Sequence, residues 1–213
     1  MLSAVQVRSF DAPEINRREI LRYALCREET QNIAQMIDEC LEEALSAMSY
    51  RVCWAEYDVP QAISSRNLAQ NLSGCDRVIA FAATVGLGLD RLLMKYSRIA
   101  PSKAVILQAI GAERIESLCD AFEEELRAQG YSLRPRFSPG YGDLPLKAQK
   151  EIFAALNCTH HIGVTLNDSL LMTPTKSVTA LIGLCGGGSE TAAGCSACPM
   201  LHCQFRRNTN EHS

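Results

Sequence analysis

The chain has 213 residues, of which 47% are hydrophobic and 21% are charged, and its formal net charge is −3 at pH 7. This composition supports a folded core without disulfide staples and excludes a mainly disordered chain. The acidic balance argues against a nucleic-acid-binding protein, and no apolar run reaches the roughly 20 residues of a membrane-spanning helix. Because the first residues lack a signal-peptide pattern, we expect a soluble, cytoplasmic protein.

Helices and strands alternate without a regular repeat over the first 130 residues. Apolar side chains recur at three- and four-residue steps in the first clear element, which predicts an amphipathic helix. Two later segments are rich in β-branched and aromatic residues and predict strands. A proline then divides a long helical region. The expected elements are a helix over 29–49, strands over 51–59 and 75–86, and helices over 87–99 and 103–129.

The remaining sequence predicts a loop, one further helix and two strands. A change in composition follows them. A Pro- and Gly-rich loop is followed by a helix over 147–157 and by strands over 164–174 and 176–184. This mixture of elements indicates the α+β class. We expect a domain over 1–184 and a glycine linker with a Cys-rich tail over 185–213.

The loop contains the most informative side chains before the tail. Pro139 and Gly140 hold Arg136 and Tyr141 at a fixed separation. A guanidinium can clamp a carboxylate through two hydrogen bonds, and a phenol offers an apolar face with a polar tip. The alternative is a tight turn before a helix, in which Arg136 pairs with an acid of the protein surface.

The sequence Arg136-Phe-Ser-Pro-Gly140-Tyr141 resembles the S-adenosylmethionine-binding signature of the activation domain of cobalamin-dependent methionine synthase. The resemblance continues through the helix over 147–157 and the block over 162–183, in the family's order. It covers about residues 119–183. A single Arg-x-x-x-Gly-Tyr motif is weakly specific, whereas the ordered set is more specific.

The resemblance implies a C-shaped α+β domain built on a twisted antiparallel sheet, with S-adenosylmethionine in a shallow groove. It also implies ligand contacts from Arg136, Gly140 and Tyr141, with Pro139 shaping the loop. The family uses an acid on the preceding helix, two residues before a phenylalanine, and Asp120 occupies that position here.

The family's activity is the rescue of oxidised cobalamin, in which one electron and a methyl group from S-adenosylmethionine restore methylcobalamin. This chain lacks the cobalt-ligating histidine motif and the other modules of methionine synthase. The resemblance therefore implies a free-standing component, with no catalytic residue assigned, that acts on cobalamin held by a corrinoid-binding methionine synthase or methyltransferase. An electron donor is a second expected partner.

The sequence departs from the family after the last strand. There the family has aromatic residues that close over the ligand, whereas this chain continues with Leu184-Cys185 and three glycines. Part of the family's ligand cover is therefore missing or replaced.

The last thirty residues contain a cluster of cysteines. Cys195, Cys198 and Cys203 follow C-x2-C-x4-C spacing, and Cys185 could supply a fourth thiolate, with His202 as a weaker candidate. Thiolate clusters bind iron–sulfur centres or zinc. We expect an iron–sulfur cluster, with zinc and a reactive metal-free tail as alternatives. The six scattered cysteines are expected to be core residues without disulfides.

Two other functions remain open at this stage. The cysteine tail could be the active part of a redox or metal-binding module that docks to a corrinoid protein. Alternatively, the chain could be a scaffold that docks such a protein without binding S-adenosylmethionine.

Overall fold

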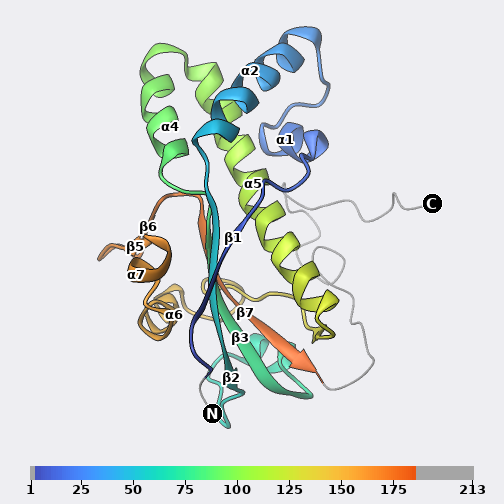
Figure 1. Ribbon diagram of the computed structural model, residues 1–213, viewed down its shortest axis with the longest axis vertical. Helices are drawn as coiled ribbons and strands as arrows, with labels where there is room; N and C mark the ends of the chain where they lie inside the picture. Colours follow the sequence, from blue (N-terminus) through green and yellow to red (C-terminus); the bar gives the residue numbers. More distant parts are fainter. Residues whose placement is uncertain (1–2, 186–213) are drawn as a thin grey trace, which may run out of the picture.

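The computed structural model describes residues 3–185, and its centre is a curled antiparallel sheet (Figure 1). The strand order is β1-β2-β3-β7-β4, and every neighbouring pair is antiparallel. The α+β class and the antiparallel sheet expected from the sequence are thus confirmed. The strands are β1 (Gln6–Phe10), β2 (Tyr50–Asp58), β3 (Cys75–Thr84), β4 (Ser132–Leu133) and β7 (Ser177–Cys185).

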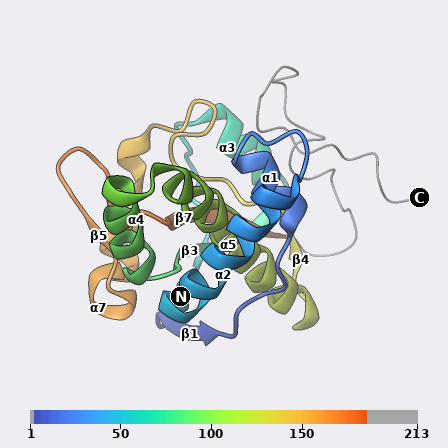
Figure 2. The same cartoon turned by 90° about the horizontal axis from the view of Figure 1, so that it is seen from above.

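Helices cover both faces of the sheet, as the two views in Figures 1 and 2 show. One face carries α1 (Arg17–Tyr23), α2 (Gln31–Ala47), α4 (Gly88–Ile99) and the long α5 (Pro101–Ala128). The opposite face carries α3 (Arg66–Asn71), the 3-10 turn η1 (Leu146–Ala148), α6 (Gln149–Leu156) and α7 (Cys158–Ile162). Among these helices, none combines the length and apolar character needed to cross a membrane.

The helix boundaries follow from local chemistry. The Thr30 hydroxyl accepts a hydrogen bond from the Ile33 amide (3.4 Å) and caps the start of α2. Pro101 is the first residue of α5, where the missing amide hydrogen costs nothing, and it ends the helical run of α4 at Ile99. The predicted division of the helical region near this proline is therefore confirmed.

One expected strand is instead a small hairpin. The segment 164–174 contains two short strands, β5 (Thr165–Leu166) and β6 (Met172–Thr173), paired with each other and separate from the main sheet. The turn forms because the Asn167 side chain accepts a hydrogen bond from the Leu171 amide (2.9 Å). Local side-chain hydrogen bonding thus replaces a continuous strand.

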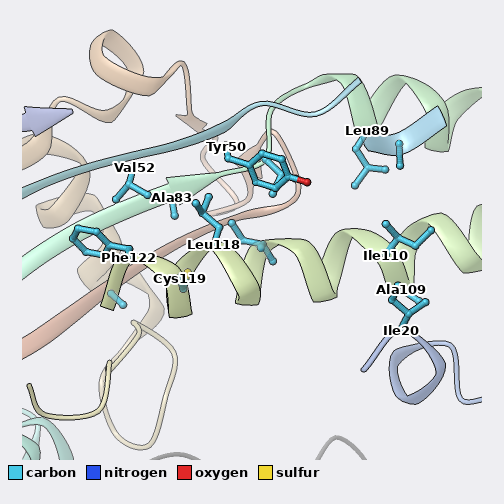
Figure 3. Packing of buried hydrophobic residues seen from close by; sticks show 14 of the residues in the cluster. Ile20, Tyr50, Val52, Ala83, Leu89, Ala109, Ile110, Leu118, Cys119 and Phe122 are labelled. Carbon is cyan, nitrogen blue, oxygen red and sulfur yellow. The ribbon is translucent and has the colours of Figure 1, made fainter. Parts of the chain in front are cut away.

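The larger hydrophobic core lies between α5 and the sheet. The ring of Phe122 lies 5.1 Å from Trp54 and 5.2 Å from Phe81, measured between ring centroids. Figure 3 shows Phe122 and Leu118 of α5 facing Val52 of β2. The side chains of α5 that point to the sheet therefore fix the helix across its face.

The scattered cysteines divide into two groups. Cys40, Cys53, Cys119 and Cys158 are buried and free, in agreement with their expected role as core residues. The fifth free cysteine of the described residues, Cys26, is half-buried.

Cys75 differs from these core cysteines because it forms a disulfide with Cys185. The expectation of no disulfides is therefore wrong for this pair. The two residues are cross-strand partners on β3 and β7, although 110 positions separate them in the sequence. The sheet register brings them together, and no local sequence pattern shows it.

We predict that Phe122→Ala lowers the free energy of unfolding by about 3–5 kcal/mol, because it leaves a cavity beside the rings of Trp54 and Phe81. Chemical denaturation of both proteins measures the difference. Val105→Ala is the matched control, since Val105 lies on the same helix but is exposed, and it should change stability by less than about 0.5 kcal/mol. Equal effects of the two substitutions would contradict this packing.

Candidate functional site

The arginine loop, residues 134–143, continues from β4 along the same edge of β7. The Arg134 amide donates to the Gly183 carbonyl (2.8 Å), and Phe137 exchanges two backbone hydrogen bonds with Leu181 (2.8 and 2.9 Å). Successive side chains of an extended segment point to opposite faces. Arg136 accordingly reaches the α5 face, whereas Phe137 packs against the hydrophobic cluster of the other face.

Three carboxylates of α5 surround the Arg136 guanidinium. Its Nη1 donates to Asp120 Oδ1 (2.7 Å) and to Glu123 Oε1 (2.5 Å). Its Nη2 donates to Glu116 Oε2 (2.7 Å). The pairing of Arg136 with acids, which the sequence left open as an alternative, is therefore present, and it ties the loop to α5.

The acidic surroundings set the electrostatics of this cluster. Burial alone would lower the pKa of Arg136, but the neighbouring acidic groups outweigh it and raise the pKa above its ordinary value. Glu123 also accepts a hydrogen bond from Arg127 (3.0 Å), so the cluster holds two guanidiniums as well as three carboxylates. Asp120 is the most exposed of the three acids, with 45% of its side chain accessible. A cation approaching from solvent would therefore meet Asp120 first.

A second arginine, Arg114 of α5, holds the chain segment before α1 in place. Arg114 is fully buried, and it donates to the carbonyls of Pro13 (2.5 Å) and Glu14 (2.6 Å). Its partner Glu113 accepts a hydrogen bond from the Asn16 amide (3.0 Å). These bonds hold the segment before α1 against α5.

The space between this segment and α5 is a groove of about 480 Å³. Asp120 lies on its wall and also contacts Arg136, so the groove and the arginine loop share a carboxylate. The lining is mostly polar and includes two further acids, Glu14 and Glu124. The lining residues are Pro13, Glu14, Ile15, Asn16, Arg17, Ser117, Asp120, Ala121 and Glu124.

The other loop residues singled out in the sequence do not all face this groove. Pro139 is buried and lines a separate cavity of about 630 Å³ on the opposite face of the sheet. Gly140 has a φ of +90°, which favours glycine, and its amide donates to the Leu144 carbonyl (2.8 Å). Tyr141 is 60% exposed, with its ring 5.9 Å from that of Phe137.

The distal end of the loop has its own anchor. The Asp143 carboxylate accepts hydrogen bonds from the Ser65 hydroxyl and from the amides of Arg66 (2.8 Å) and Asn67 (3.1 Å) at the start of α3. These bonds lower the pKa of Asp143 below its ordinary value, with the Ser65 hydrogen bond as the main cause. The sequence analysis did not identify this residue.

Two groups of site residues were missed for different reasons. Glu116 and Glu123 flank Asp120 at helical spacing, so an acidic stripe on α5 was readable from the sequence. Glu14 is about a hundred residues away, and only the buried contacts of Arg114 bring it to the groove. No local signal points to it.

The predicted metal ligands are not gathered within residues 3–185, where no cluster of three or more His, Cys, Asp or Glu side chains is arranged for a metal ion. Cys195, Cys198 and Cys203 lie outside the described residues, as does His202. Cys185 is inside them, but its disulfide with Cys75 removes the thiolate that a metal would need. The assignment of Cys185, Cys195, Cys198 and Cys203 as metal ligands therefore stays a prediction.

The described residues thus form an antiparallel sheet with a long helix across one face and an arginine loop at its edge. The chain is similar to a solved structure described as the MetH reactivation domain bound to AdoHcy, with a TM-score of 0.60 at 16% identity. The match covers 89% of this chain and 81% of that chain.

A family model described as "Vitamin B12 dependent methionine synthase, activation domain" matches residues 27–185, and the chain belongs to this family. The family resemblance found in the sequence is thereby confirmed. Among curated protein sequences, none matches the chain.

We predict that Arg114→Met lowers the free energy of unfolding by about 3–5 kcal/mol, because it leaves Glu113 buried without its counter-charge. Hydrogen exchange should also become faster at Asn16, whose amide is held by Glu113. Replacing both residues, as Glu113→Leu with Arg114→Met, removes the unpaired charge and should recover much of the stability. A single variant as stable as the wild type would exclude the structural role given to this pair.

Proposed function

We propose that the groove binds S-adenosylmethionine and that the chain supports the reductive remethylation of cobalamin held by another protein. The observation that carries this proposal is the position of Asp120, which lines the groove and contacts Arg136. One binding surface thus presents carboxylates and a guanidinium side by side.

The charges of this surface are complementary to those of the ligand. S-adenosylmethionine carries an ammonium and a sulfonium, which carboxylates attract, and a carboxylate, which a guanidinium can bind. Asp120 and Glu14 supply the negative groups, and Arg136 supplies the positive one. Tyr141 does not line this groove, and its ring packs against Phe137. The described residues therefore bind and orient the methyl donor.

The similarity to a reactivation domain that is bound to AdoHcy supports this assignment. AdoHcy has the adenosyl and amino-acid groups of S-adenosylmethionine but lacks the transferable methyl group and the sulfonium charge. A pocket that holds AdoHcy in this fold is suited to the product of methyl transfer.

The role of the chain follows from its family. Cobalamin, carried by a corrinoid-binding methionine synthase or methyltransferase, supplies the cobalt centre that accepts the methyl group, and a separate donor supplies the electron. The chain presents the methyl donor to that partner. It acts as a component of methyltransferase activity, without a catalytic residue of its own.

The redox or docking module remains the alternative function. It depends on an iron–sulfur cluster or zinc bound by cysteines of the tail, most of which lie outside the described residues. The polar groove favours S-adenosylmethionine binding, since a docking module does not require it.

We predict that Asp120→Asn and Glu14→Gln each weaken S-adenosylmethionine binding about 10- to 100-fold, because a charge-assisted contact is lost. Calorimetry measures the affinities. Glu42→Gln is the control, since Glu42 is exposed on α2 away from the groove lining, and it should bind normally.

AdoHcy provides a second readout in the same calorimetric experiment. Because it lacks the sulfonium charge, its affinity should fall less than that of S-adenosylmethionine in Asp120→Asn. Unchanged affinities in both groove variants would refute the proposed site.

We further predict that the 213-residue chain alone forms no methionine from homocysteine, because residues 27–185 match an activation domain and that domain does not bind homocysteine or cobalamin by itself. Added to a corrinoid methyltransferase that lacks its activation domain, with S-adenosylmethionine and a reductant, it should restore turnover of the oxidised enzyme. Asp120→Asn should restore less at limiting S-adenosylmethionine. Methionine formation by the chain alone would contradict this division of roles.

A further inference from the structure

The outward side of α4 carries apolar and basic side chains in alternation. Leu89, Leu93 and Tyr96 of this helix point inward and are buried in the larger core. On the opposite side, residues spaced by four, three and four positions fall on one line along the helix. We call these residues the α4 stripe, and they are Leu87, Arg91, Met94 and Arg98.

All members of the α4 stripe are exposed, and Met94 is 65% exposed. Within residues 3–185, the guanidiniums of Arg91 and Arg98 form neither an ion pair nor a hydrogen bond with another residue. Asp90 is adjacent in sequence but binds elsewhere, since its carboxylate accepts hydrogen bonds from the Thr175 amide (2.9 Å) and hydroxyl. Both arginines are therefore available to a binding partner.

The acid beside the stripe is also engaged. Glu43 of α2 accepts a hydrogen bond from the Tyr96 hydroxyl (2.6 Å), and its other carboxylate oxygen lies 3.6 Å from Lys95 Nζ. The α4 stripe thus combines unpaired positive charge with exposed apolar side chains, on a chain whose net charge is −3. Arginine and methionine are both enriched in protein–protein interfaces.

The geometry of α4 fits a protein partner better than a membrane surface. A helix that lies in a membrane interface buries a continuous apolar face in lipid, whereas the continuous apolar face of α4 already packs in the core. A guanidinium binds a carboxylate through two hydrogen bonds, and the flexible side chain of Met94 adapts to an irregular apolar surface. The matching surface is therefore acidic around an apolar centre.

The α4 stripe belongs to the same helical layer as the groove. Helix α4 packs along the first turns of α5, and the later turns of α5 carry Asp120 of the groove lining. Figure 2 shows α4 and α5 side by side, with α4 at the outer end of the layer. A partner bound to α4 lies on the face of the sheet that also contains the groove.

We propose that the α4 stripe is the docking surface for the corrinoid-holding partner, which meets it with carboxylates around an apolar contact. The identity of the partner rests on the proposed function. The stripe shares no residue with the groove lining, so docking and S-adenosylmethionine binding can be lost separately.

The test measures binding of the full chain to a corrinoid methyltransferase that lacks its activation domain, by biolayer interferometry. The double variant Arg91→Glu with Arg98→Glu should raise the dissociation constant about tenfold or more, because attraction to carboxylates becomes repulsion. Added salt should weaken the wild-type complex. The matched control is Lys147→Glu with Lys150→Glu, which makes the same charge change at exposed positions on the opposite face and should bind normally.

A second pair of variants tests the apolar part of the contact. Met94→Gln should weaken binding about threefold or more, whereas Leu146→Gln, at an exposed apolar position on the opposite face, should not. Circular dichroism and S-adenosylmethionine calorimetry should be unchanged in every variant, which separates lost docking from a lost fold.

Three outcomes would overturn the proposal. The first is equal affinity of the wild type and the double arginine variant for the partner, or no wild-type complex at all. The second is binding to phosphatidylglycerol vesicles that the double variant loses while partner binding stays unchanged. The third is self-association, detected by sedimentation, that the double variant abolishes without affecting the partner.

The same measurements distinguish this proposal from the proposed function. A wild-type chain that binds the partner through α4 but does not bind S-adenosylmethionine would refute the groove assignment and leave the docking surface intact. A chain that binds S-adenosylmethionine but not the partner would refute the docking surface alone.

Discussion

The buried Glu113–Arg114 pair determines where the N-terminal part of the chain can lie. A buried guanidinium needs a counter-charge and hydrogen-bond acceptors for its N–H groups. Leaving it without them costs several kcal/mol of folding free energy. Glu113 supplies the charge, and the carbonyls of Pro13 and Glu14 accept two of the donors. The segment before α1 must therefore rest on α5, and the groove beside it exists because of this contact.

The two sides of helix α5 make different kinds of contact. Its apolar side, with Leu118 and Phe122, packs on the sheet and fixes the helix in place. Its charged side pairs with one arginine of the helix itself, Arg114, and with one from the loop, Arg136. Because both arginines are positioned by one rigid helix, the groove and the loop keep a defined geometry relative to each other.

The sequence predicts those elements whose signals are local. The helix α2 and the strands β2, β3 and β7 have strong periodicity or β-branched composition, and the structure contains them. Short elements are missed, since the five residues of β1 and the six of α3 carry little pattern of their own and form against long-range partners.

The candidate site shows the same limit. Asp120 and Arg136 could be linked through a family motif, and the structure brings them into contact. Glu14 reaches the groove only through the buried contacts of Arg114, and Cys75 meets Cys185 only through the register of β3 and β7. Long-range packing of this kind leaves no trace in spacing or composition.

The arginine loop is anchored at both ends. Arg136 binds carboxylates of α5, and Asp143 accepts hydrogen bonds from the start of α3. Ordering the backbone of one residue costs about 1–2 kcal/mol of conformational entropy at room temperature. Here the loop is already ordered in the folded protein, so a ligand that contacts it does not have to order it on binding. The binding free energy of such a ligand is then set by its contacts and its desolvation.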